Sequence, residues 1–305
     1  MQELIRALEQ TKLQFSPDEP MRDHTSFRIG GPVAVMVFPR DETQVVSAVQ
    51  IVKNTGQTPL ILGNGSNILA GDAPLVRAVI KLCNGEDGVV QLERRGEREI
   101  YAAAGVLLSR AAVFAQKAGL AGLAFAHGIP GSIGGAVRMN AGAYGGEMAQ
   151  VVRSVRYLDT NTGKIQTISG ADLAFAYRHS RFTNSDDVIL GASLMLKPGS
   201  PAEIRAEMDD LAARRSSSQP LNLPSAGSAF KRPQNGYAAA LIDEAGLKGY
   251  SIGGAKISEK HAGFIVNQAD ATCNDVLRLM AHIQETVFAK TGIQLESEVE
   301  VIQGN

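Results

Sequence analysis

Clustered glycines constrain this chain more than any other feature of its sequence. Nine of the 32 glycines fall in the 28 residues from 119 to 146, where an average frequency of about one in ten would give about three. Glycine weakens helices and strands because it loses the most conformational freedom on folding. A glycine cluster with interleaved apolar residues therefore favours loops in which the backbone comes close to a ligand or to another segment.

Composition and charge narrow the class of protein. A length of 305 residues suggests about two domains, and a hydrophobic content of 44% is ample for a packed core. Thirty Lys and Arg balance thirty-one Asp and Glu, so we expect no nucleic-acid partner. Two cysteines, Cys83 and Cys273, are too few for a disulfide framework or a cysteine metal site, and no metal is expected. Without a long apolar run or a signal-peptide core, we expect a cytoplasmic protein with no membrane insertion, and a monomer by default.

Strand and helix signals alternate along the chain. A capped start at Asp41, with Gln44 three residues on, and a stop at Gly56 predict one helix. Further helices are predicted at 107–118, 201–215, 236–245 and 273–291, and strands at 33–38, 59–62, 151–158, 164–168, 187–196, near 252–266 and at 293–302. The Ser/Pro-rich residues 214–224 are interpreted as a linker or a domain edge. We predict a domain boundary near residue 200 and a finer division near residue 80.

Two glycine-rich loops are candidates for binding chemistry. GNGSN at 63–67 follows a predicted strand and offers successive backbone N–H groups, which is typical of phosphate binding. An ordinary tight turn is the alternative. GIPGSIGGAVRMNAG at 128–142 adds the polar Ser132 and Asn140, with close helix–sheet packing as its alternative. Together the loops suggest a dinucleotide held from both ends. Ile68 stands where the Rossmann fingerprint needs its third glycine, so a nicotinamide-binding Rossmann domain is not expected.

Five motifs in order resemble a known family. GNGSN, GIPGSIGGAVRMNAGAYG, AYRHSRF, LPSAGSAFKRP and LESEV are similar to those of the UDP-N-acetylenolpyruvoylglucosamine reductases of bacterial peptidoglycan precursor synthesis. The resemblance extends from HTSFRIGG at 24–31 to LESEVEVI at 295–302. It implies an α+β fold: a two-subdomain FAD-binding part of the vanillyl-alcohol oxidase (PCMH) type, at 1–80 and 81–200, and a C-terminal α+β substrate-binding domain at 201–305. It also implies that NADPH reduces non-covalently bound FAD, which then reduces UDP-N-acetylglucosamine enolpyruvate to UDP-N-acetylmuramate.

Three catalytic residues follow from the resemblance. Arg178 in AYRHSRF is the cation beside the enolpyruvyl carboxylate, whose geometry suits a guanidinium fork. Ser228 in AGSAF is the proton donor, and Glu298 in LESEV is the catalytic glutamate, although Ser297 stands where the family commonly has proline. From the residues alone, a surface arginine, a turn serine and an acidic strand edge remain open. In a regular strand at 293–302, the three glutamates would share one face.

The resemblance also implies two sets of binding residues. The cofactor set is Gly63, Asn64, Gly65, Ser66, Asn67, Gly128, Pro130, Gly131, Ser132, Gly134, Gly135, Ala136, Asn140 and Gly142. The substrate set is Tyr144, Tyr177, Lys231, Arg232, Lys248 and His261. Some members have asparagine in place of Arg232, and His261 could instead be an internally bonded histidine at a strand start.

Three further points remain open at the level of sequence. Residues 177–228 leave no room for the extra tyrosine-bearing segment of some members, so a shorter type is expected. A nucleotide-sugar binding module that has lost its flavin is one alternative. An alcohol oxidase of the same flavin fold, with His127 as a covalent flavin link, is the other.

Overall fold

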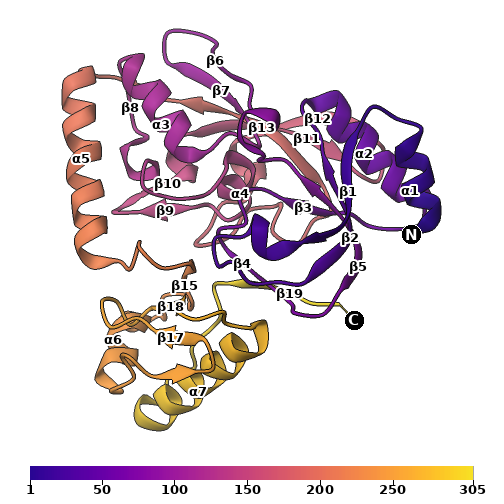
Figure 1. The fold of residues 1–305 in the computed structure, drawn as a ribbon. Coiled ribbons are helices and arrows are strands. Elements are labelled where there is room, and N and C mark those ends of the chain that lie inside the picture. Colours follow the sequence, from indigo (N-terminus) through magenta and orange to yellow (C-terminus); the bar gives the residue numbers. More distant parts are fainter. Residues whose placement is uncertain (305) are drawn as a thin grey trace. The chain divides into compact units, whose positions relative to one another are not determined.

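The computed structural model describes residues 1–304, apart from the side chain of Glu86, and the chain divides into two units. Unit 1 comprises Met1–Pro17, Val35–Asn64 and Arg77–Arg214, and unit 2 comprises Asp18–Ala34, Gly65–Val76 and the residues from 215 onward. Each unit combines strands with helices (Figure 1), which confirms the predicted α+β class. The segments of the units interleave along the sequence, whereas the predicted boundaries at 80 and 200 separate continuous stretches and stay a prediction.

Unit 1 is built on two sheets, although residues 18–20, 32–34 and 75–76 of the first sheet belong to the residue range of unit 2. The first has the order β1-β2-β5-β3, from β1 (Gln14–Pro20), β2 (Pro32–Phe38), β5 (Leu75–Lys81) and β3 (Leu60–Leu62). The second has the order β12-β11-β13-β7-β6, from β12 (Lys164–Ser169), β11 (Val152–Asp159), β13 (Val188–Met195), β7 (Glu99–Ala103) and β6 (Leu92–Arg94). Two short antiparallel pairs complete the unit: β9 (Gly142–Ala143) with β10 (Gly146–Glu147), and β8 (Leu120–Ala121) with β14 (Lys197–Pro198).

The helices of unit 1 bury apolar side chains in its core. They are α1 (Gln2–Glu9), α2 (Glu42–Asn54), α3 (Leu108–Lys117), α4 (Ile133–Arg138) and α5 (Pro201–Ser218), whose last turn extends into the residue range of unit 2. Helix α2 begins as predicted, because the Asp41 carboxylate accepts the N–H of Gln44 at 2.8 Å. Its valines 45, 49 and 52 are buried together. Helix α1 lies beside α2 (Figure 1) and buries Leu4 and Leu8.

Helix α4 was not predicted, and it is the element that places the second glycine loop. It begins inside that loop, with Ser132 as its N-cap residue, and packs against β13 and β7. Strand β13 is buried over Val188–Leu194, so it is covered on both faces. The loop is therefore attached to the most buried strand of unit 1.

Unit 2 holds the C-terminal residues. Its sheet has the order β15-β18-β17-β16, from β15 (Ser225–Ser228), β18 (Phe264–Asn267), β17 (Ala255–Ile257) and β16 (Ser251–Ile252), and β4 (Ile68–Ala70) pairs in parallel with β19 (Glu300–Ile302). Two helices pack together, α6 (Ala238–Glu244) and α7 (Cys273–Thr291). The predicted bounds of α7 are confirmed: Thr272 and Asp275 form a capping box, and Gly292 ends the helix with φ of +71°. Short 3-10 turns lie at Met21–His24 here, and at Gly85–Asp87, Ala124–Ala126, Met148–Gln150 and Gly170–Leu173 in unit 1.

Two predictions about the C-terminal third were wrong. The helix predicted to end near 215 continues to Ser218, since Pro220, rather than the serines, is what stops it. The single strand predicted at 293–302 is broken: residues 296–298 follow 229–231, and only Glu300–Ile302 pair with β4. The chain changes its partner between these pieces, so Val301 is 39% exposed rather than sharing a buried face with Val299.

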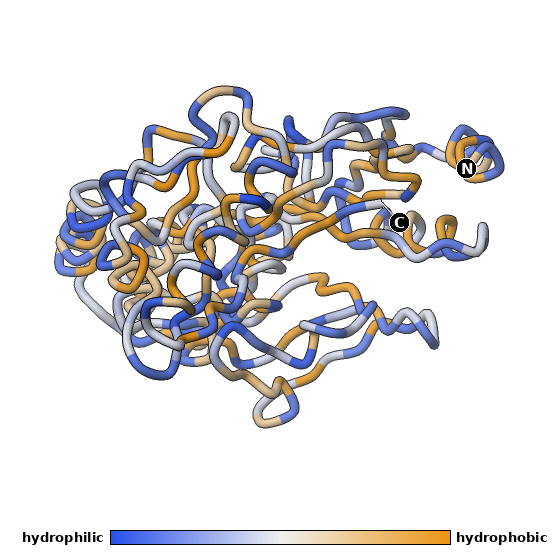
Figure 2. The backbone as a smooth tube through the Cα atoms, turned by 90° about the horizontal axis from the view of Figure 1, so that it is seen from below, coloured by the Kyte–Doolittle hydropathy of each residue, from blue (hydrophilic) through white to orange (hydrophobic). Residues whose placement is uncertain are grey.

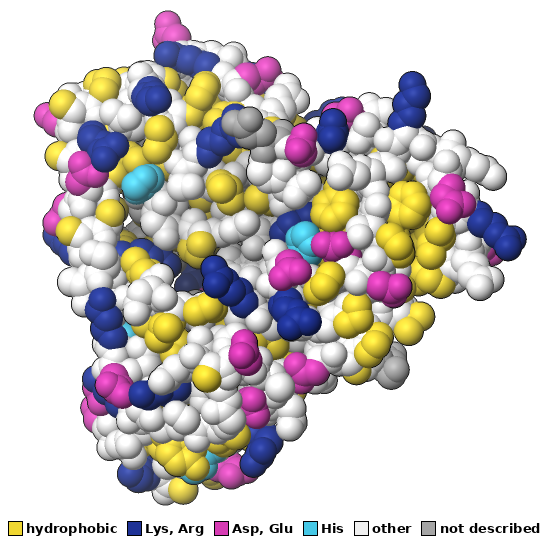
Figure 3. All heavy atoms as spheres, in the orientation of Figure 1, with side chains coloured by type: hydrophobic (Ala, Val, Ile, Leu, Met, Phe, Trp, Pro, Cys, Tyr) yellow, Lys and Arg dark blue, Asp and Glu magenta, His cyan; other side chains and the backbone are white. Residues whose placement is uncertain are grey.

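The surface and the helices carry mixed polarity. The coil of α1, beside the N-terminus in Figure 2, shows hydrophobic and hydrophilic residues in alternation, as its one buried face requires. Basic and acidic side chains are interspersed over the face drawn in Figure 3, in keeping with a net charge of −1. Within residues 1–304, no helix has both the length and the apolar character needed to cross a membrane.

Candidate active site

Residues of the two glycine loops lie side by side in unit 1. Asn64 Nδ2 donates a hydrogen bond to the carbonyl of Pro130. A Cβ atom added to Gly63 would lie 2.3 Å from Oγ of Ser132, closer than real Cβ atoms come to any neighbour. A side chain at position 63 would have to displace the Ser132 hydroxyl, so the two loops approach closely at this glycine. This approach supports the prediction that both loops serve one ligand.

Ser132 presents an unused polar group at this junction. Its side chain is only 1% exposed, it makes no capping bond to α4, and its Oγ has no hydrogen-bond partner among the described residues. A buried hydroxyl without a partner costs free energy, about 1–3 kcal/mol. A phosphate oxygen would satisfy it, and Gly135, whose added Cβ would meet only Ser132 Oγ at 3.9 Å, leaves room for one. These residues fit the pyrophosphate of FAD.

Several predicted cofactor residues also make contacts within the protein. The N–H of Gly134 donates to Ala104 at 2.9 Å, and an added Cβ would lie 3.0 Å from Ala104 Cβ. The buried amide of Asn140 donates to Ala176 and accepts from the N–H of Ala149. These two match the packing alternative.

Three more predicted cofactor residues are engaged within their own units. Gly142 meets Gly146 and Glu147 across the β9–β10 hairpin, Ala136 is buried with its N–H bonded to Ser132, and Gly65 packs on the carbonyl of His24 with φ of +64°. Gly128, Gly131 and Ser66 stay predicted cofactor residues on the sequence alone.

Sequence reasoning missed two buried titratable residues at the end of β5. Burial lowers the pKa of Lys81 to about 8, although the neighbouring Cys83 opposes this. Burial likewise raises the pKa of the Cys83 thiol, which lies 3.6 Å from Oδ1 of Asn64. The available signal was a lysine at the end of the apolar strand β5. Within residues 1–304, no three His, Cys, Asp or Glu side chains could hold a metal ion together.

Arg178 occupies a strained turn in unit 1. The backbones of Ala176 and His179 exchange two hydrogen bonds of 3.1 Å, which encloses Tyr177 and Arg178 as the central residues of a turn. Arg178 has φ of +53°, the left-handed conformation that favours glycine at this place in a type II turn. Such strain costs of order 1–3 kcal/mol and is concentrated at functional sites. The arginine at this position therefore costs some stability relative to glycine.

Arg181, the other arginine of AYRHSRF, is committed elsewhere. Its Nη2 lies 2.8 Å from Oδ2 of Asp187, and the side chains of the pair are only 28% and 9% exposed. The guanidinium also lies over the rings of Tyr157 and Phe182. The structure therefore separates two arginines that composition could not distinguish.

Ser228 and Glu298 come from neighbouring segments of unit 2. The N–H of Glu298 donates to the carbonyl of Ala229, the residue after Ser228, at 2.9 Å. Ser228 ends β15 opposite Phe264 of β18. Asn67 Nδ2 donates to the carbonyl of Glu298 at 3.0 Å, so this predicted cofactor residue holds the glutamate segment. The break in the predicted strand makes Glu298 half-buried, while Glu296 and Glu300 are exposed.

The predicted substrate residues are spread over both units. In unit 1, Tyr144 is exposed at the tip of the β9–β10 hairpin with φ of +53°, and exposed Tyr177 has the Arg178 guanidinium 5.1 Å from its ring centre. In unit 2, three basic side chains have protein partners: Lys231 with Glu296, Lys248 with Asp243 and Arg232 with the ring of Tyr237. No chemical feature of these exposed side chains distinguishes them from ordinary surface residues.

His261 is a neutral hydrogen-bonding histidine. Its Nδ1 accepts the N–H of Gly263 at 3.1 Å. Burial is the main reason why the pKa of the His261 ring lies below 6.5. The positive charge of nearby Lys248 lowers this pKa further, and a hydrogen bond to the backbone of His261 opposes the shift. The ring therefore brings no positive charge to a diphosphate near pH 7, and its Nε2 carries the proton.

The His261 pKa predicts a pH effect on stability. As pH falls below about 6.5, the unfolded chain takes up this proton before the folded chain does, so the free energy of unfolding decreases. Above pH 6.5 the histidine is neutral in both the folded and the unfolded chain, so its full contribution to the free energy of unfolding is present. We expect His261→Asn to flatten the stability profile between pH 6.5 and 5, as measured by urea unfolding. An unchanged slope would contradict this assignment.

Gly63 provides a test of the loop junction. In Gly63→Ala, the new Cβ must displace the Ser132 hydroxyl, which can rotate because it is the end of a short side chain. We expect the apoprotein to keep most of its stability, while FAD affinity, measured by fluorescence titration, falls by roughly tenfold, the effect of about 1.4 kcal/mol. Ser132→Ala should weaken FAD similarly, and the double variant no more than either single one. Fully additive losses would show that the two residues act separately.

The matches to known proteins agree with this architecture. Residues 32–169 match the family described as FAD binding domain, and residues 219–302 match the UDP-N-acetylenolpyruvoylglucosamine reductase C-terminal domain. The reductase of that name from Clostridioides difficile is 45% identical over 292 residues, which cover 96% of this chain and 94% of that protein. The one from Pediococcus pentosaceus is 42% identical over 291 residues, with 95% of each chain covered.

A solved structure extends the match to three dimensions. The crystal structure of UDP-N-acetylenolpyruvylglucosamine reductase (MurB) from Thermus caldophilus superposes with a TM-score of 0.80 at 33% identity, covering 95% of this chain and 99% of that one. These relatives thus cover nearly the whole sequence, and the two family matches cover residues 32–169 and 219–302 of it. The chain therefore belongs to the UDP-N-acetylenolpyruvoylglucosamine reductase family.

Proposed function

We propose that this protein reduces UDP-N-acetylglucosamine enolpyruvate to UDP-N-acetylmuramate in peptidoglycan precursor synthesis, with FAD as its bound cofactor and NADPH as electron donor. The observation that carries this function is the 45% identity to a reductase of that name over nearly the full length of both chains. The match of residues 32–169 to an FAD binding domain supplies the cofactor. The protein is thus an FAD-dependent oxidoreductase of cell-wall synthesis.

Residues of unit 1 would hold the cofactor without a covalent link. When bound, FAD takes two electrons from NADPH and passes a hydride to the vinyl carbon of the substrate. Gly135 leaves space for a phosphate oxygen, Gly63 lets the two loops come together, and the Ser132 hydroxyl would donate a hydrogen bond to that oxygen. Asn64 holds the first loop against Pro130. The unpaired Ser132 hydroxyl supports this assignment.

Arg178 orients the substrate carboxylate and stabilises its developing charge. Hydride addition to an enolpyruvyl ether leaves negative charge on the adjacent carbon and on its carboxylate. A guanidinium pairs with a carboxylate through two parallel hydrogen bonds, and it acts most strongly when it is preorganised. The strained turn at Arg178 supports this role, because the chain keeps an arginine where glycine would be more stable.

Ser228 delivers the proton and Glu298 supports it. The Ser228 hydroxyl protonates the carbon next to the carboxylate, and solvent then restores the proton to the serine. Glu298 is held one residue away across the backbone bond to Ala229, so it is positioned to act on this proton transfer. The two residues come from β15 and from the segment before β19, which bring them together within unit 2.

The remaining substrate contacts are carried by the exposed tyrosines and basic residues. Tyr144, Tyr177, Lys231, Arg232 and Lys248 would contact the nucleotide sugar, and neutral His261 could only donate a hydrogen bond from Nε2. Within this proposal, residues 1–80 and 81–200 form the FAD-binding subdomains and 201–305 the substrate domain. We also propose the shorter subtype, a monomer, and the cytoplasm, where NADPH and nucleotide sugars are available.

An anaerobic absorbance experiment tests the function. The purified protein is mixed with NADPH and then with the UDP-sugar enolpyruvate while the flavin band is followed. We expect bleaching and then recovery in proportion to the substrate added. Bleaching without recovery would exclude this substrate but keep the flavoprotein, and a protein that remains colourless after incubation with FAD would exclude the reductase.

A further inference from the structure

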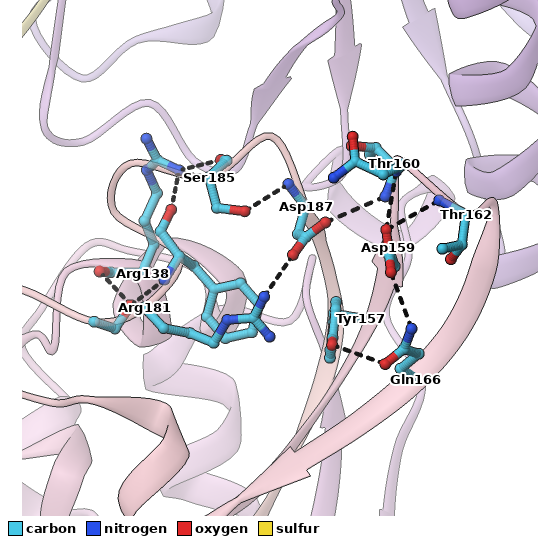
Figure 4. A network of polar contacts seen from close by, with 12 residues as sticks. Arg138, Tyr157, Asp159, Thr160, Thr162, Gln166, Arg181, Ser185 and Asp187 are labelled. Carbon is cyan, nitrogen blue, oxygen red and sulfur yellow. Dashed lines mark hydrogen bonds and ion pairs between the residues drawn. The ribbon is translucent and has the colours of Figure 1, made fainter.

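A single arginine joins the helix of the second glycine loop to the arginine segment, defined as residues 176–187. Arg138 is the last residue of α4, and its guanidinium donates to three backbone carbonyls of that segment: Phe182 at 2.6 Å, Thr183 at 2.7 Å and Ser185 at 3.4 Å. Figure 4 shows its side chain pointing toward Ser185. A planar fork with several N–H donors can satisfy diverging carbonyls, which a single ammonium group cannot.

The arginine segment returns hydrogen bonds to the same helix end. The hydroxyl groups of Ser180 and Thr183 donate to the carbonyl of Arg138 at 2.8 and 3.1 Å. Ser180 is completely buried, so water does not compete for its bond. Asn140, two residues beyond Arg138, donates to the carbonyl of Ala176 at 3.0 Å. Bonds from both sides therefore fix the distance between α4 and this segment.

A second anchor holds the far end of the arginine segment. Asp187 pairs with Arg181 at 2.8 Å and also accepts the N–H of Thr160, in the turn between β11 and β12, at 3.2 Å. Figure 4 shows Asp187 between these two partners. The Ala176–His179 turn, which contains the strained Arg178, lies at the other end of the segment and is held at Ala176 by the bond from Asn140.

We propose that Arg138 is a positioning residue for Arg178: it fixes the arginine segment to the helix of the cofactor loop and so places the Arg178 guanidinium for the substrate carboxylate. The proposal rests on the proposed function and adds a residue that does not touch cofactor or substrate. A displacement of about 1 Å in a reacting group can reduce a rate by about 10²-fold. The loss should therefore appear in the half-reaction that uses the carboxylate, not in the one that uses NADPH.

Two variants of Arg138 test the proposal in the full-length, FAD-loaded protein. Arg138→Gln removes the fork, and Arg138→Lys keeps the charge but reaches fewer carbonyls. We expect FAD content and the rate of flavin reduction by NADPH to stay within about twofold of wild type. Reoxidation by the enolpyruvate should fall by roughly 10²-fold in the glutamine variant, with a raised KM, and less in the lysine variant. Ser180→Ala should show the same pattern with a smaller loss.

Arg156→Gln is the matched control. Arg156 makes two hydrogen bonds to Glu42, at 2.7 and 2.8 Å, in the same unit but outside the arginine segment. Its loss should lower stability without changing the ratio of the rates of the two half-reactions.

Amide hydrogen exchange of the apoprotein gives a readout besides activity: residues 177–183 should exchange faster in Arg138→Gln and at the wild-type rate in Arg156→Gln.

The outcomes separate this inference from the proposed function. If wild type itself is not reoxidised by the enolpyruvate, the proposed function fails. If wild type is reoxidised and Arg138→Gln is reoxidised equally fast, the positioning role is wrong. The positioning role would also be wrong if both half-reactions slowed equally and in proportion to a lower FAD content or a lower melting temperature. Arg138 would then only support the fold. If the glutamine variant does not fold, Arg138→Lys and Ser180→Ala decide by the same ratio.

Discussion

Ser228→Ala is expected to give a yellow, folded protein that NADPH still reduces but that the enolpyruvate barely reoxidises. The hydroxyl is the proposed proton source, and positioned proton transfer contributes about 10²–10⁴-fold to rates. We therefore expect reoxidation to slow by about 10³-fold, while flavin reduction by NADPH stays near the wild-type rate. Stopped-flow absorbance of the two half-reactions measures both quantities in one preparation.

Ser225→Ala is the matched control for Ser228→Ala. Ser225 lies on the same strand, β15, opposite Val266, and its backbone carbonyl accepts a hydrogen bond from the hydroxyl of Ser26. The control should reoxidise like wild type.

A second readout follows the proton itself: in D₂O, wild-type turnover should place one deuterium on the carbon next to the carboxylate. Rapid reoxidation of Ser228→Ala would assign the proton to another group, with Glu298 as the next candidate.

Local sequence signals predicted the elements that carry their own start and stop. The Asp41 cap fixed the beginning of α2, and the Thr272 box with Gly292 fixed both ends of α7. Strands β2, β11, β12 and β13 followed from runs of apolar and β-branched residues. In each case residues within a few positions of one another determine the conformation, so no knowledge of distant partners was needed.

Distant partners explain what could not be predicted. The segment around Glu298 leaves a regular strand because it pairs first with Ala229 and then, from Glu300, with Ile68 of β4. Helix α4 forms within glycine-rich sequence because Ala104 and Val106 accept its first N–H groups. The local sequence predicts neither of these pairings.

The same limit applies to the candidate site. The glycine loops could be identified by residue type, but the contact of Gly63 with Ser132 required the fold. Arg138 left no signal at all, because its acceptors are backbone carbonyls, which every residue possesses. The motif resemblance named Arg178, whereas the strain at that position is visible only in its backbone angle.

Arg178→Gly should stabilise the protein and inactivate its oxidative half-reaction together. Glycine relieves the left-handed conformation at φ of +53°, a gain of about 1–2 kcal/mol. It also gives the unfolded chain more freedom, which costs about 0.5–1 kcal/mol. The net expectation is a gain of roughly 0.5–1 kcal/mol in the free energy of unfolding. For a unit of this size, each kcal/mol raises the melting temperature by about 2–4 °C.

Activity should change in the opposite direction. Without the guanidinium, charge on the substrate carboxylate is unsupported, and losses of about 10²–10³-fold are typical when one such donor is removed. Flavin reduction by NADPH should continue, and Arg178→Lys, which keeps the charge without the fork, should lie between glycine and wild type. Calorimetry and half-reaction kinetics on the same samples measure the two effects.

Ala174→Gly separates the two effects because Ala174, in the same unit, has φ of +48° and no proposed contact with substrate. It should gain stability as Arg178→Gly does and keep wild-type reoxidation. We expect both glycine variants to be more stable than wild type, with Arg178→Gly inactive and Ala174→Gly active. That result would show that the strained backbone at position 178 is tolerated because the arginine side chain is needed. If Arg178→Gly instead loses stability, the arginine holds its turn through its own contacts. Its left-handed backbone would then be explained by folding rather than by recognition of the carboxylate.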